Sequence, residues 1–481
     1  MREFRKNEFD KTRRSFLAGA AGLFLAGAQA SSTSAIGDDG LDGTADVTLR
    51  IAPVQFEVAP GRTINTVGYN GAVPGPVVRF REGVAARVDL FNDTGAPEWV
   101  HWHGFHSPVD VDGSEEEGSL MVPAHGRLRY RLTPTPSGSR YVHTHAMSMS
   151  DLTRGAFTGQ FAAVYVEPKQ NLGRYDQEIF LATHEWEPRL TSMEEEDDTS
   201  PPLRMTDHKS TDPKPHGWEV GYRYYTINGK CLGYGDPIRV KVGQRILFHF
   251  LNASATESVR LALPGHRFEV VALDGNPVPR PQLVDVLELG TAERIDAIAL
   301  MDTPGIWILG SPHDSHRAKG MGIVIEYANN SGKPQWVTPP NIPWDYTIFG
   351  DNRPAPVPDE VIPLVIGQVS GGKGTFEHWT LNGQGYDPRN PPRRLRKGKR
   401  HRLVFDNPTN DVHPLHLHRQ NFELVSVSGK PTGGVMKDVV LVKNNQKVEV
   451  DVTPLMSGLT LFHCHQQLHM DYGFKMLLDV T

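Results

Sequence analysis

A threefold internal repeat is the feature that most constrains how this chain of 481 residues can fold. An Asn-Gly pair occurs three times at intervals of about 155 residues, and each pair is followed by a strand-like run that ends in asparagine. Asn-Gly favours tight turns, and runs rich in β-branched and aromatic residues favour sheet strands. The copies are Tyr69-Asn70-Gly71 with 87–92, Ile227-Asn228-Gly229 with 245–252, and Leu381-Asn382-Gly383 with 402–407.

The repeat predicts three similar all-β domains, built as Greek-key barrels or sandwiches. The 47 glycines and 37 prolines suit a fold with many turns, and no stretch of useful length has helical periodicity. We expect the domains at residues 31–170, 171–340 and 341–481, with linkers near 168–175 and 328–345.

The first 30 residues are typical of an export signal rather than of a folded segment. Basic residues that include Arg13 and Arg14 precede an apolar stretch too short to span a bilayer, and Ala28-Gln29-Ala30 is typical of a cleavage site. The paired arginines before Ser-Phe-Leu resemble the twin-arginine signal, which exports folded proteins. We therefore expect a periplasmic or secreted monomer without a membrane span.

The charge of the mature chain bears on its partners. Residues 1–30 carry six basic and three acidic side chains, so their removal changes the formal net charge from −6 to −9. An acidic chain argues against nucleic acid as a partner. We expect the acidic runs Glu115–Glu117 and Glu194–Asp198 to be solvated loops, and the basic run Arg393–Arg400 to be a solvent-facing strand edge.

Four His-x-His pairs stand out among the 21 histidines. On a strand, residues i and i+2 point to the same face, so each pair presents two imidazoles side by side. Two pairs lie in the first expected domain and two in the third, so a metal cluster between these domains would draw eight imidazoles from them. The pairs are His101 with His103, His143 with His145, His416 with His418, and His463 with His465.

Only two cysteines are present, Cys231 and Cys464. Strand alternation turns Cys464 away from the two histidines that flank it, so one strand can serve two metal sites. Cys464 with His413 and His469 supplies one thiolate and two imidazoles, the trigonal ligand set of a blue-copper electron-transfer centre. A metal-bound cysteine cannot also form a disulfide, so we expect Cys231 to be unpaired.

These motifs, their order and their spacing resemble those of the three-domain multicopper oxidases, a family that includes laccases and bacterial copper oxidases. The resemblance covers essentially the whole mature chain and implies three cupredoxin-like domains, four coppers per chain and dioxygen as the electron acceptor. It implies type 1 copper ligands at His413, Cys464 and His469, and a three-copper cluster between domains 1 and 3. Type 2 copper would be bound by His101 and His416, and the type 3 pair by His103, His143, His145, His418, His463 and His465.

Alignment of the repeats indicates that the middle domain has the fold without the ligands. Val259, Ala262 and Pro264 stand where the last domain has His413, His416 and His418, and Gly310, Ser311 and Pro312 stand where it has His463, Cys464 and His465. In the first domain Thr144 replaces the cysteine. We expect His266, His313 and His316 of the middle domain to be structural.

The resemblance also implies roles for three further positions. Asp112 matches the family's carboxylate near the type 2 copper and is the candidate proton relay, with a surface-turn aspartate as the alternative. Where many bacterial members carry a glutamate after the second type 1 histidine, this chain has Met470, and strand alternation would turn Asp471 to the other face. At the axial position, ten residues after Cys464, Phe474 cannot donate to copper, which predicts a high-potential centre.

The implied reaction couples one-electron oxidation of a reducing substrate near His469 to the four-electron reduction of dioxygen to water. Phenols or aromatic amines are the favoured donors, because no methionine-rich insert is present beyond the close pair Met147 and Met149. The alternatives are a metallo-oxidase acting on Cu(I), Fe(II) or Mn(II), and a copper-free scaffold. A copper nitrite reductase fits less well, because it would lack the cluster in the third domain.

Overall fold

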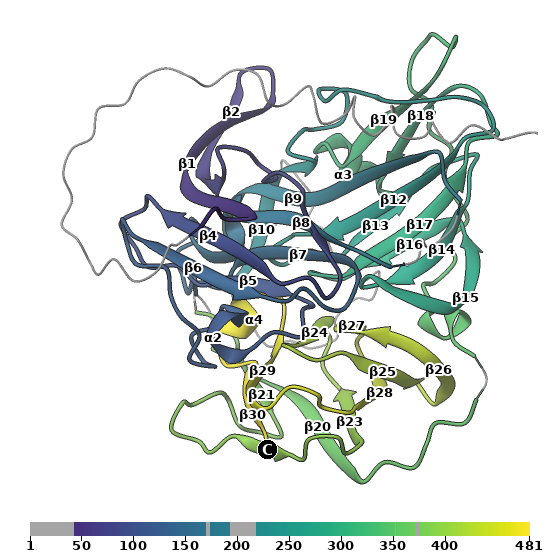
Figure 1. The fold of residues 1–481 in the computed structure, drawn as a ribbon. Coiled ribbons are helices and arrows are strands. Elements are labelled where there is room, and N and C mark those ends of the chain that lie inside the picture. The colour runs from purple at the N-terminus through teal and green to yellow at the C-terminus, as the bar shows by residue number, and fades with distance from the viewer. Residues whose placement is uncertain (1–42, 170–173, 193–217, 352, 372–374) are drawn as a thin grey trace, which may run out of the picture. The chain divides into compact units, whose positions relative to one another are not determined.

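Six β-sheets, two from each third of the chain, make up the described structure (Figure 1). The computed structural model describes residues 43–169, 174–192, 218–351, 353–371 and 375–481, and residues 45–481 form one unit. The expected export signal at 1–30 and the acidic run Glu194–Asp198 lie outside the described residues. No described helix is long and apolar enough to cross a membrane.

The first third of the chain forms two four-stranded sheets, ordered β2-β1-β4-β6 and β3-β8-β7-β5. Two short helical turns interrupt the strands. The elements are β1 (Val47–Ala59), β2 (Arg62–Tyr69), β3 (Val78–Arg81), β4 (Ala86–Asn92), β5 (Val100–His103), α2 (Val109–Asp112), β6 (Arg127–Leu132), β7 (Gly138–Thr144), η1 (Gly155–Phe157) and β8 (Phe161–Glu167).

The middle third forms a six-stranded sheet, β10-β9-β12-β17-β14-β15, and a five-stranded sheet, β11-β19-β18-β13-β16. Its elements are β9 (Gln177–Ser192), β10 (Trp218–Ile227), β11 (Ile238–Val240), β12 (Arg245–Asn252), β13 (Val259–Ala262), β14 (Phe268–Leu273), β15 (Asn276–Val284), β16 (Val286–Leu289), β17 (Arg294–Leu300), β18 (Ile306–Gly310), α3 (Asp314–Ala318) and β19 (Gly322–Tyr327).

The last third repeats this topology, with a six-stranded sheet β21-β20-β23-β28-β25-β26 and a five-stranded sheet β22-β30-β29-β24-β27. The paired sheets confirm the expected all-β fold. The elements are η2 (Tyr346–Phe349), β20 (Glu360–Val369), β21 (His378–Leu381), β22 (Arg393–Leu395), β23 (His401–Asn407), β24 (His413–Leu417), β25 (Phe422–Val427), β26 (Lys430–Lys437), β27 (Val439–Val442), β28 (Gln446–Val452), β29 (Gly458–Cys464), α4 (Gln467–Asp471) and β30 (Lys475–Val480). The basic run 393–400 begins on β22, at the edge of its sheet, as expected.

The three Asn-Gly pairs form the same turn and make the same contacts. Each asparagine has a φ of 51–54° and each glycine a φ of 72–78°, which is the conformation that a type I′ turn requires. Each asparagine side chain also binds the neighbouring strand, accepting one backbone N–H and donating to one carbonyl at 2.7–2.9 Å. The partners are Arg50 and Thr48 for Asn70, Ala182 and Phe180 for Asn228, and Val365 and Pro363 for Asn382.

Strand register relates the middle third to the last third position by position. His416 on β24 lies opposite His463 on β29, and Ala262 on β13 lies opposite Gly310 on β18. This agrees with the alignment made from the repeat. The two thirds therefore differ at these positions in their side chains and not in the pairing of their backbones.

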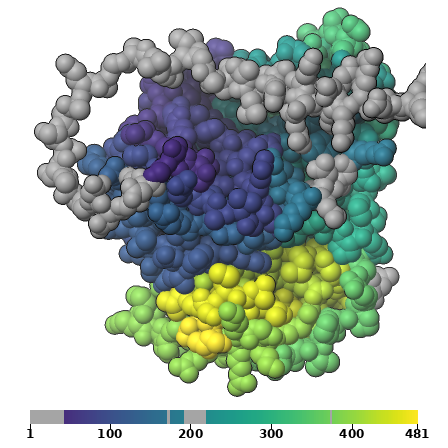
Figure 2. Space-filling view, in the orientation of Figure 1, coloured from purple at the N-terminus to yellow at the C-terminus, as the bar shows by residue number. Residues whose placement is uncertain are grey.

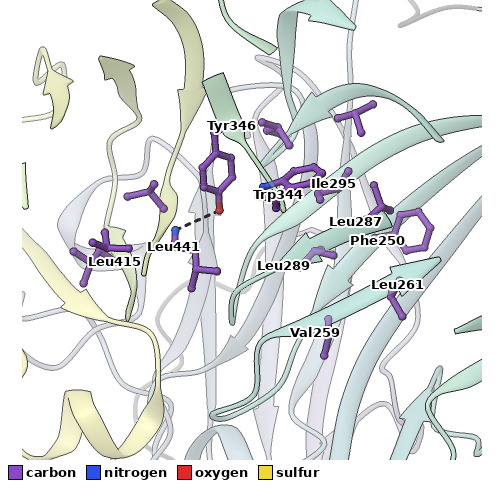
Figure 3. Close-up of a cluster of buried hydrophobic side chains, with 14 of the residues drawn as sticks. Phe250, Val259, Leu261, Leu287, Leu289, Ile295, Trp344, Tyr346, Leu415 and Leu441 are labelled. Atoms are coloured by element: carbon purple, nitrogen blue, oxygen red, sulfur yellow. Dashed lines mark hydrogen bonds between the residues drawn. The ribbon is translucent and has the colours of Figure 1, made fainter. Parts of the chain in front are cut away.

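A continuous apolar core links the middle and last thirds. Figure 3 shows Trp344 and Tyr346, on the segment that joins the two thirds, among side chains such as Leu289 and Leu441. The hydroxyl of Tyr346 accepts the backbone N–H of Leu441 at 3.4 Å. Burying an apolar side chain of this size contributes roughly 1.5–3 kcal/mol, so this core holds the last third firmly against the middle one.

Candidate metal centre

Eight buried histidines gather where strands of the first and last thirds meet. None of them is more than 7% exposed. Figure 2 shows the yellow C-terminal residues directly against the blue residues of the first third, and the hydroxyl of Tyr141 hydrogen-bonds His465 Nε2 across this contact at 3.0 Å. The histidines are 101 and 103 on β5, 143 on β7, 145 just after it, 416 on β24, 418 just after it, 463 on β29 and 465 just after it.

The imidazole rings from the two thirds stack on one another. His103 lies over His416 with ring centroids 3.7 Å apart, and His101 lies over His418 at 4.0 Å. The ring nitrogens also converge, since His101 Nε2 is 3.4 Å from His416 Nε2. Several groups of three histidines have nitrogens within 4.8 Å of one another, which is the spacing of ligands around a shared metal.

Hydrogen bonds decide which ring nitrogen of each histidine is free. In five of the eight, Nδ1 bonds an oxygen at 2.8–2.9 Å, so Nδ1 carries the proton and Nε2 carries the lone pair. These five are His101, His143, His416, His418 and His463. His103 is reversed: its Nε2 lies 3.0 Å from Asp438 Oδ1, and its Nδ1 has no hydrogen-bond partner among the described residues.

Burial favours the neutral form of four of these imidazoles. Desolvation, reinforced by the neighbouring rings, lowers the pKa of His103, His143 and His416 well below the usual value, and it lowers the pKa of His418 to about 4. A metal binds only the deprotonated nitrogen. The residues thus fit a cluster of metal ions that prefer imidazole, and copper is among them.

A second site lies on the other side of β29. Cys464 Sγ is 3.8 Å from His413 Nδ1 and 3.6 Å from His469 Nδ1, and the two nitrogens are 3.2 Å apart. Burial raises the pKa of the Cys464 thiol, so a bound cation would be needed to hold the thiolate. The fully buried ring of Phe474 packs against His413 with centroids 5.0 Å apart. One thiolate and two imidazoles without an axial donor fit a copper site for electron transfer.

The two sites share one strand. His463 and His465 face the histidine cluster, with ring centroids 5.3 Å apart, while Cys464 faces His413 and His469. Cys464 and His413 are fully buried, whereas His469 is partly exposed and forms the accessible edge of the second site. The alternation of a β-strand therefore separates two kinds of metal environment by a single peptide unit.

Asp112 is fully buried and is not a surface-turn residue. Its Oδ2 accepts a hydrogen bond from His418 Nδ1 at 2.8 Å, and its carbonyl accepts one from His101 Nδ1 at 2.8 Å. The hydroxyl of Ser107 donates to Oδ1. Burial alone would raise the pKa of Asp112, but His101 and His418 lower it well below the usual value, so the group is an ionised acceptor beside the cluster.

The expectation that residues 115–117 form a solvated loop is wrong for two of the three. Glu117 is 2% exposed, and its Oε1 accepts the backbone N–H of Leu461 on β29 at 2.6 Å. Burial and the nearby Asp112 carboxylate raise the pKa of Glu117 well above its usual value. Glu116 is paired with Lys475 at 2.5 Å. Nothing in the sequence indicated that Glu116 and Glu117 would be buried, because residues 115–117 become buried only when β29 and β30 pack against them.

The expectation for Asp471 is also wrong in its reasoning. Residues 467–471 form the helix α4 and not a strand, so side-chain alternation does not apply. Asp471 Oδ2 accepts hydrogen bonds from the Ser148 N–H at 3.0 Å, the Ser148 hydroxyl at 2.9 Å and the Met149 N–H at 2.7 Å. Asp471 thus holds a loop of the first third against the helix that carries His469.

The remaining candidates in the middle third have structural partners. His266 Nε2 hydrogen-bonds the hydroxyl of Tyr327 at 2.5 Å, and the ring of His316 stacks on Tyr225 at 5.0 Å. Cys231 is buried and free, as expected.

Comparisons with known proteins agree with this chemistry. Three family models, each described as multicopper oxidase, match residues 50–171, 201–320 and 363–481. The chain is 30% identical to multicopper oxidase MmcO of Mycobacterium tuberculosis over 98% of both chains. Among solved structures, it resembles a Campylobacter jejuni multicopper oxidase described as a metallo-oxidase (19% identity, 91% of this chain and 93% of the other, TM-score 0.68). It also resembles a laccase from Botrytis aclada (16% identity, 90% and 87%, TM-score 0.69).

The two solved structures show the fold, whereas the family models and the full-length relative show the family. The models cover all three repeats, and the relative spans almost the whole chain. The chain therefore belongs to the multicopper oxidases and is a copper-dependent oxidoreductase that uses dioxygen as its electron acceptor.

Proposed function

We propose that this multicopper oxidase takes single electrons from small phenols or aromatic amines and reduces dioxygen to water with four coppers per chain. One observation carries the proposal: Cys464 and its two flanking histidines face two different sites from three consecutive positions at the end of β29. An electron accepted beside Cys464 has one peptide unit to cross before it reaches either histidine. Copper, when bound, supplies the one-electron redox chemistry.

The contacts support a specific division of the ligands. His413, Cys464 and His469 would hold the type 1 copper, since their donor atoms converge within 4.8 Å. His101 and His416 would hold the type 2 copper, because their Nε2 atoms lie 3.4 Å apart. The type 3 pair would be held by His103, His143, His145, His418, His463 and His465, a set that includes the 3.1 Å approach of His418 Nε2 to His463 Nε2.

Aromatic side chains around His469 support an organic donor. The buried ring of Trp379 lies 4.3 Å from the His469 ring, and Phe376 stacks on Tyr472 at 4.5 Å. Phe376 and Tyr472 are both half-buried, and Tyr472 directly follows α4, the helix that carries His469. Aromatic donors favour such surfaces, because ring pairs contribute beyond the area that they bury.

A metal-ion donor is the second candidate, and one observation favours it. Met147 and Met149 are 39% and 42% exposed, on the loop that Asp471 holds against α4. Thioether sulfur is a ligand that Cu(I) prefers. The ammonium of Lys475 lies 3.5 Å from Met147 Sδ, however, and would repel a cation bound there.

The donor is tested by oxygen uptake with a phenol, an aromatic amine, Cu(I) and Fe(II) presented separately to the copper-loaded protein. We expect the phenol or the aromatic amine to give the highest kcat/KM. Faster uptake with Cu(I), abolished by Met147→Leu with Met149→Leu, would establish the metallo-oxidase instead. Metal analysis of the same sample is expected to give four coppers per chain.

Asp112 is proposed to hold and pass the protons that dioxygen reduction consumes. Its carboxylate touches both His418 and Ser107, and burial and Asp112 itself raise the pKa of the neighbouring Glu117 well above the usual value. Asp112→Asn keeps the size of the side chain but removes the basic oxygen, so we expect kcat to fall by about 100-fold or more. Copper content and blue colour should stay unchanged. An unchanged kcat and pH profile would remove Asp112 from the mechanism.

We also propose that the protein is exported in its folded state through the signal at residues 1–30. Replacing Arg13 and Arg14 by lysine is expected to retain the protein in the cytoplasm. Undiminished export of that variant would argue for another route.

A further inference from the structure

We propose that Arg294, in the third of the chain without His-x-His pairs, is a positioning residue for the histidine cluster. Through Asp438 it sets which ring nitrogen of His103 faces the other histidines. The inference rests on the proposed function of that cluster. It means that the middle third helps to build the metal site although none of its residues is a metal ligand.

A buried hydrogen bond joins His103 to Asp438. Asp438 is fully buried, and its Oδ1 lies 3.0 Å from His103 Nε2. The same carboxylate accepts hydrogen bonds from Nη1 and Nη2 of Arg294 at 2.7 Å and 2.6 Å, so both of its oxygens act as acceptors in a bidentate pair. A carboxylate oxygen paired in this way accepts hydrogen bonds and does not donate them. His103 must therefore carry its proton on Nε2, which leaves the lone pair on Nδ1 facing the cluster.

The side chain of Arg294 is 1% exposed, and its guanidinium is fully hydrogen-bonded. A guanidinium has five N–H donors in a fixed fork, and all five are used here. Two bind Asp438, and three bind backbone carbonyls from the first and middle thirds of the chain. Lysine offers three donors without a planar fork, so it could not reproduce this set. The three carbonyls belong to Ser139, Ala292 and Asp274.

Gly104, directly after His103, lets this pair approach. It has a φ of +83°, and a Cβ there would lie 2.7 Å from Asp438 Oδ2 and 2.8 Å from Arg294 Nη2. Any side chain at this position would push the ion pair away from His103. The glycine of the first His-x-His motif therefore has a role at the cluster, through the space it leaves.

The backbone of Asp438 positions a second histidine. Its carbonyl accepts the Nδ1–H of His416 at 2.8 Å, and its own N–H donates to Asp274 Oδ2 at 3.2 Å. Asp274 also accepts the backbone N–H of Arg294 at 3.0 Å. Arg294 and Asp274 thus hold Asp438 from both sides, and Asp438 in turn orients one histidine from each half of the cluster.

The equivalent residue in the last third shows that this burial is particular to Arg294. In strand register, Arg294 pairs with Leu251 and Lys447 pairs with Asp406, at matching positions of the two repeats. Lys447 is 53% exposed and forms a surface ion pair with Asp406 at 3.1 Å. A surface pair of this kind contributes little. The repeat alone therefore does not require a buried arginine at this position.

The test compares Arg294→Met and Arg294→Lys with the control His249→Gln. His249 is equally buried and also joins the first and middle thirds, through Ser139 and Asp296, but it does not touch the cluster. Each copper-loaded protein is dialysed against graded chelator. Copper per chain, blue absorption and the electron paramagnetic resonance of uncoupled Cu(II) are then measured. Loss of the partner that orients a ligand typically weakens metal affinity by about 10–100-fold.

We expect Arg294→Met to lose cluster copper at about 10–100-fold lower chelator than the wild type, with an uncoupled Cu(II) signal and with its blue absorption intact. Arg294→Lys should lose cluster copper at a chelator concentration between those of Arg294→Met and the wild type. His249→Gln should match the wild type. Wild-type copper content and spectrum in folded Arg294→Met would overturn the proposal. If Arg294→Met does not fold, the isosteric variant Asp438→Asn takes its place and should likewise lose cluster copper while keeping its blue absorption. Wild-type copper content in Asp438→Asn would then overturn the proposal. A wild-type chain that binds no cluster copper would overturn the proposed function itself.

Discussion

The middle and last thirds of this chain share one topology and differ in chemistry. Both have a six-stranded and a five-stranded sheet with the same strand order. Where the last third presents His416 opposite His463, the middle third presents Ala262 opposite Gly310. The β-fold supplies two faces per strand in both thirds, and a few side chains decide whether those faces can bind metal.

The equivalence extends to the residues around Cys464. The Cys464 N–H donates to the Phe474 carbonyl at 3.0 Å, and the Ser311 N–H donates to the Met321 carbonyl at 3.2 Å. Ser311 thus stands where the last third has its thiolate, and Met321 stands where it has its axial phenylalanine. Exchanging such residues between the thirds tests whether the chemistry lies in the side chains.

The largest effect is expected from Cys464→Ser, which gives the last third the residue of the middle third. A hydroxyl is a poor copper ligand compared with a thiolate, so the blue absorption should vanish completely and oxygen uptake should fall to background. The histidine cluster should still bind copper, because no cluster ligand is changed. Visible spectra, metal analysis and oxygen uptake measure these outcomes. A variant that remained blue would disprove the assignment of Cys464.

His416→Ala, which introduces the residue found at Ala262, should have the next largest effect. It removes one of two nitrogens that lie 3.4 Å apart, so we expect the loss of one copper per chain and of most oxygen reduction. The blue absorption should persist, since His416 faces away from Cys464. Copper analysis beside the visible spectrum measures both. Simultaneous loss of the blue band would mean that the two sites are not independent.

Phe474→Met, matching Met321, should have a moderate effect. A thioether in the axial position donates weakly to copper and favours Cu(II), so the reduction potential should fall. A drop of about 60 mV corresponds to a tenfold change in the relative stability of the two oxidation states. Redox titration of the blue band measures it. An unchanged or higher potential would contradict the role given to Phe474.

The smallest effect is expected from His249, whose equivalent in the last third is Val404. Burial lowers the pKa of His249, but Asp296 and Glu178 outweigh it and raise the pKa to about 9. The stabilisation is therefore complete below the unfolded value of about 6.5 and is lost as the pH rises through about 9. Compared with His249→Gln, the wild type should have a higher Tm at pH 6, on the order of 2 °C, and this advantage should shrink at pH 9.5. A constant difference would contradict the pKa shift.

Local patterns predicted the parts of the site that depend on neighbours along the chain. The Asn-Gly repeats, the four His-x-His pairs and the opposition of Cys464 to its flanking histidines follow from turn chemistry and from the two-residue period of a strand. Both are settled within a few residues, so they can be read before any tertiary contact is known. The absence of ligands from the middle third could likewise be seen from the aligned repeats.

Only the tertiary structure decided the burial of Glu117, the hydrogen bond of Asp471 with Ser148, the orientation of the His103 ring and the ion pair of Arg294 with Asp438. Each depends on a contact between segments more than a hundred residues apart, such as Arg294 with Asp438. The positions of acidic residues in the sequence do not reveal whether a carboxylate contacts water, a histidine or an arginine. That outcome is set by which sheets pack together, because burial makes an unpaired charge costly and makes its partner necessary.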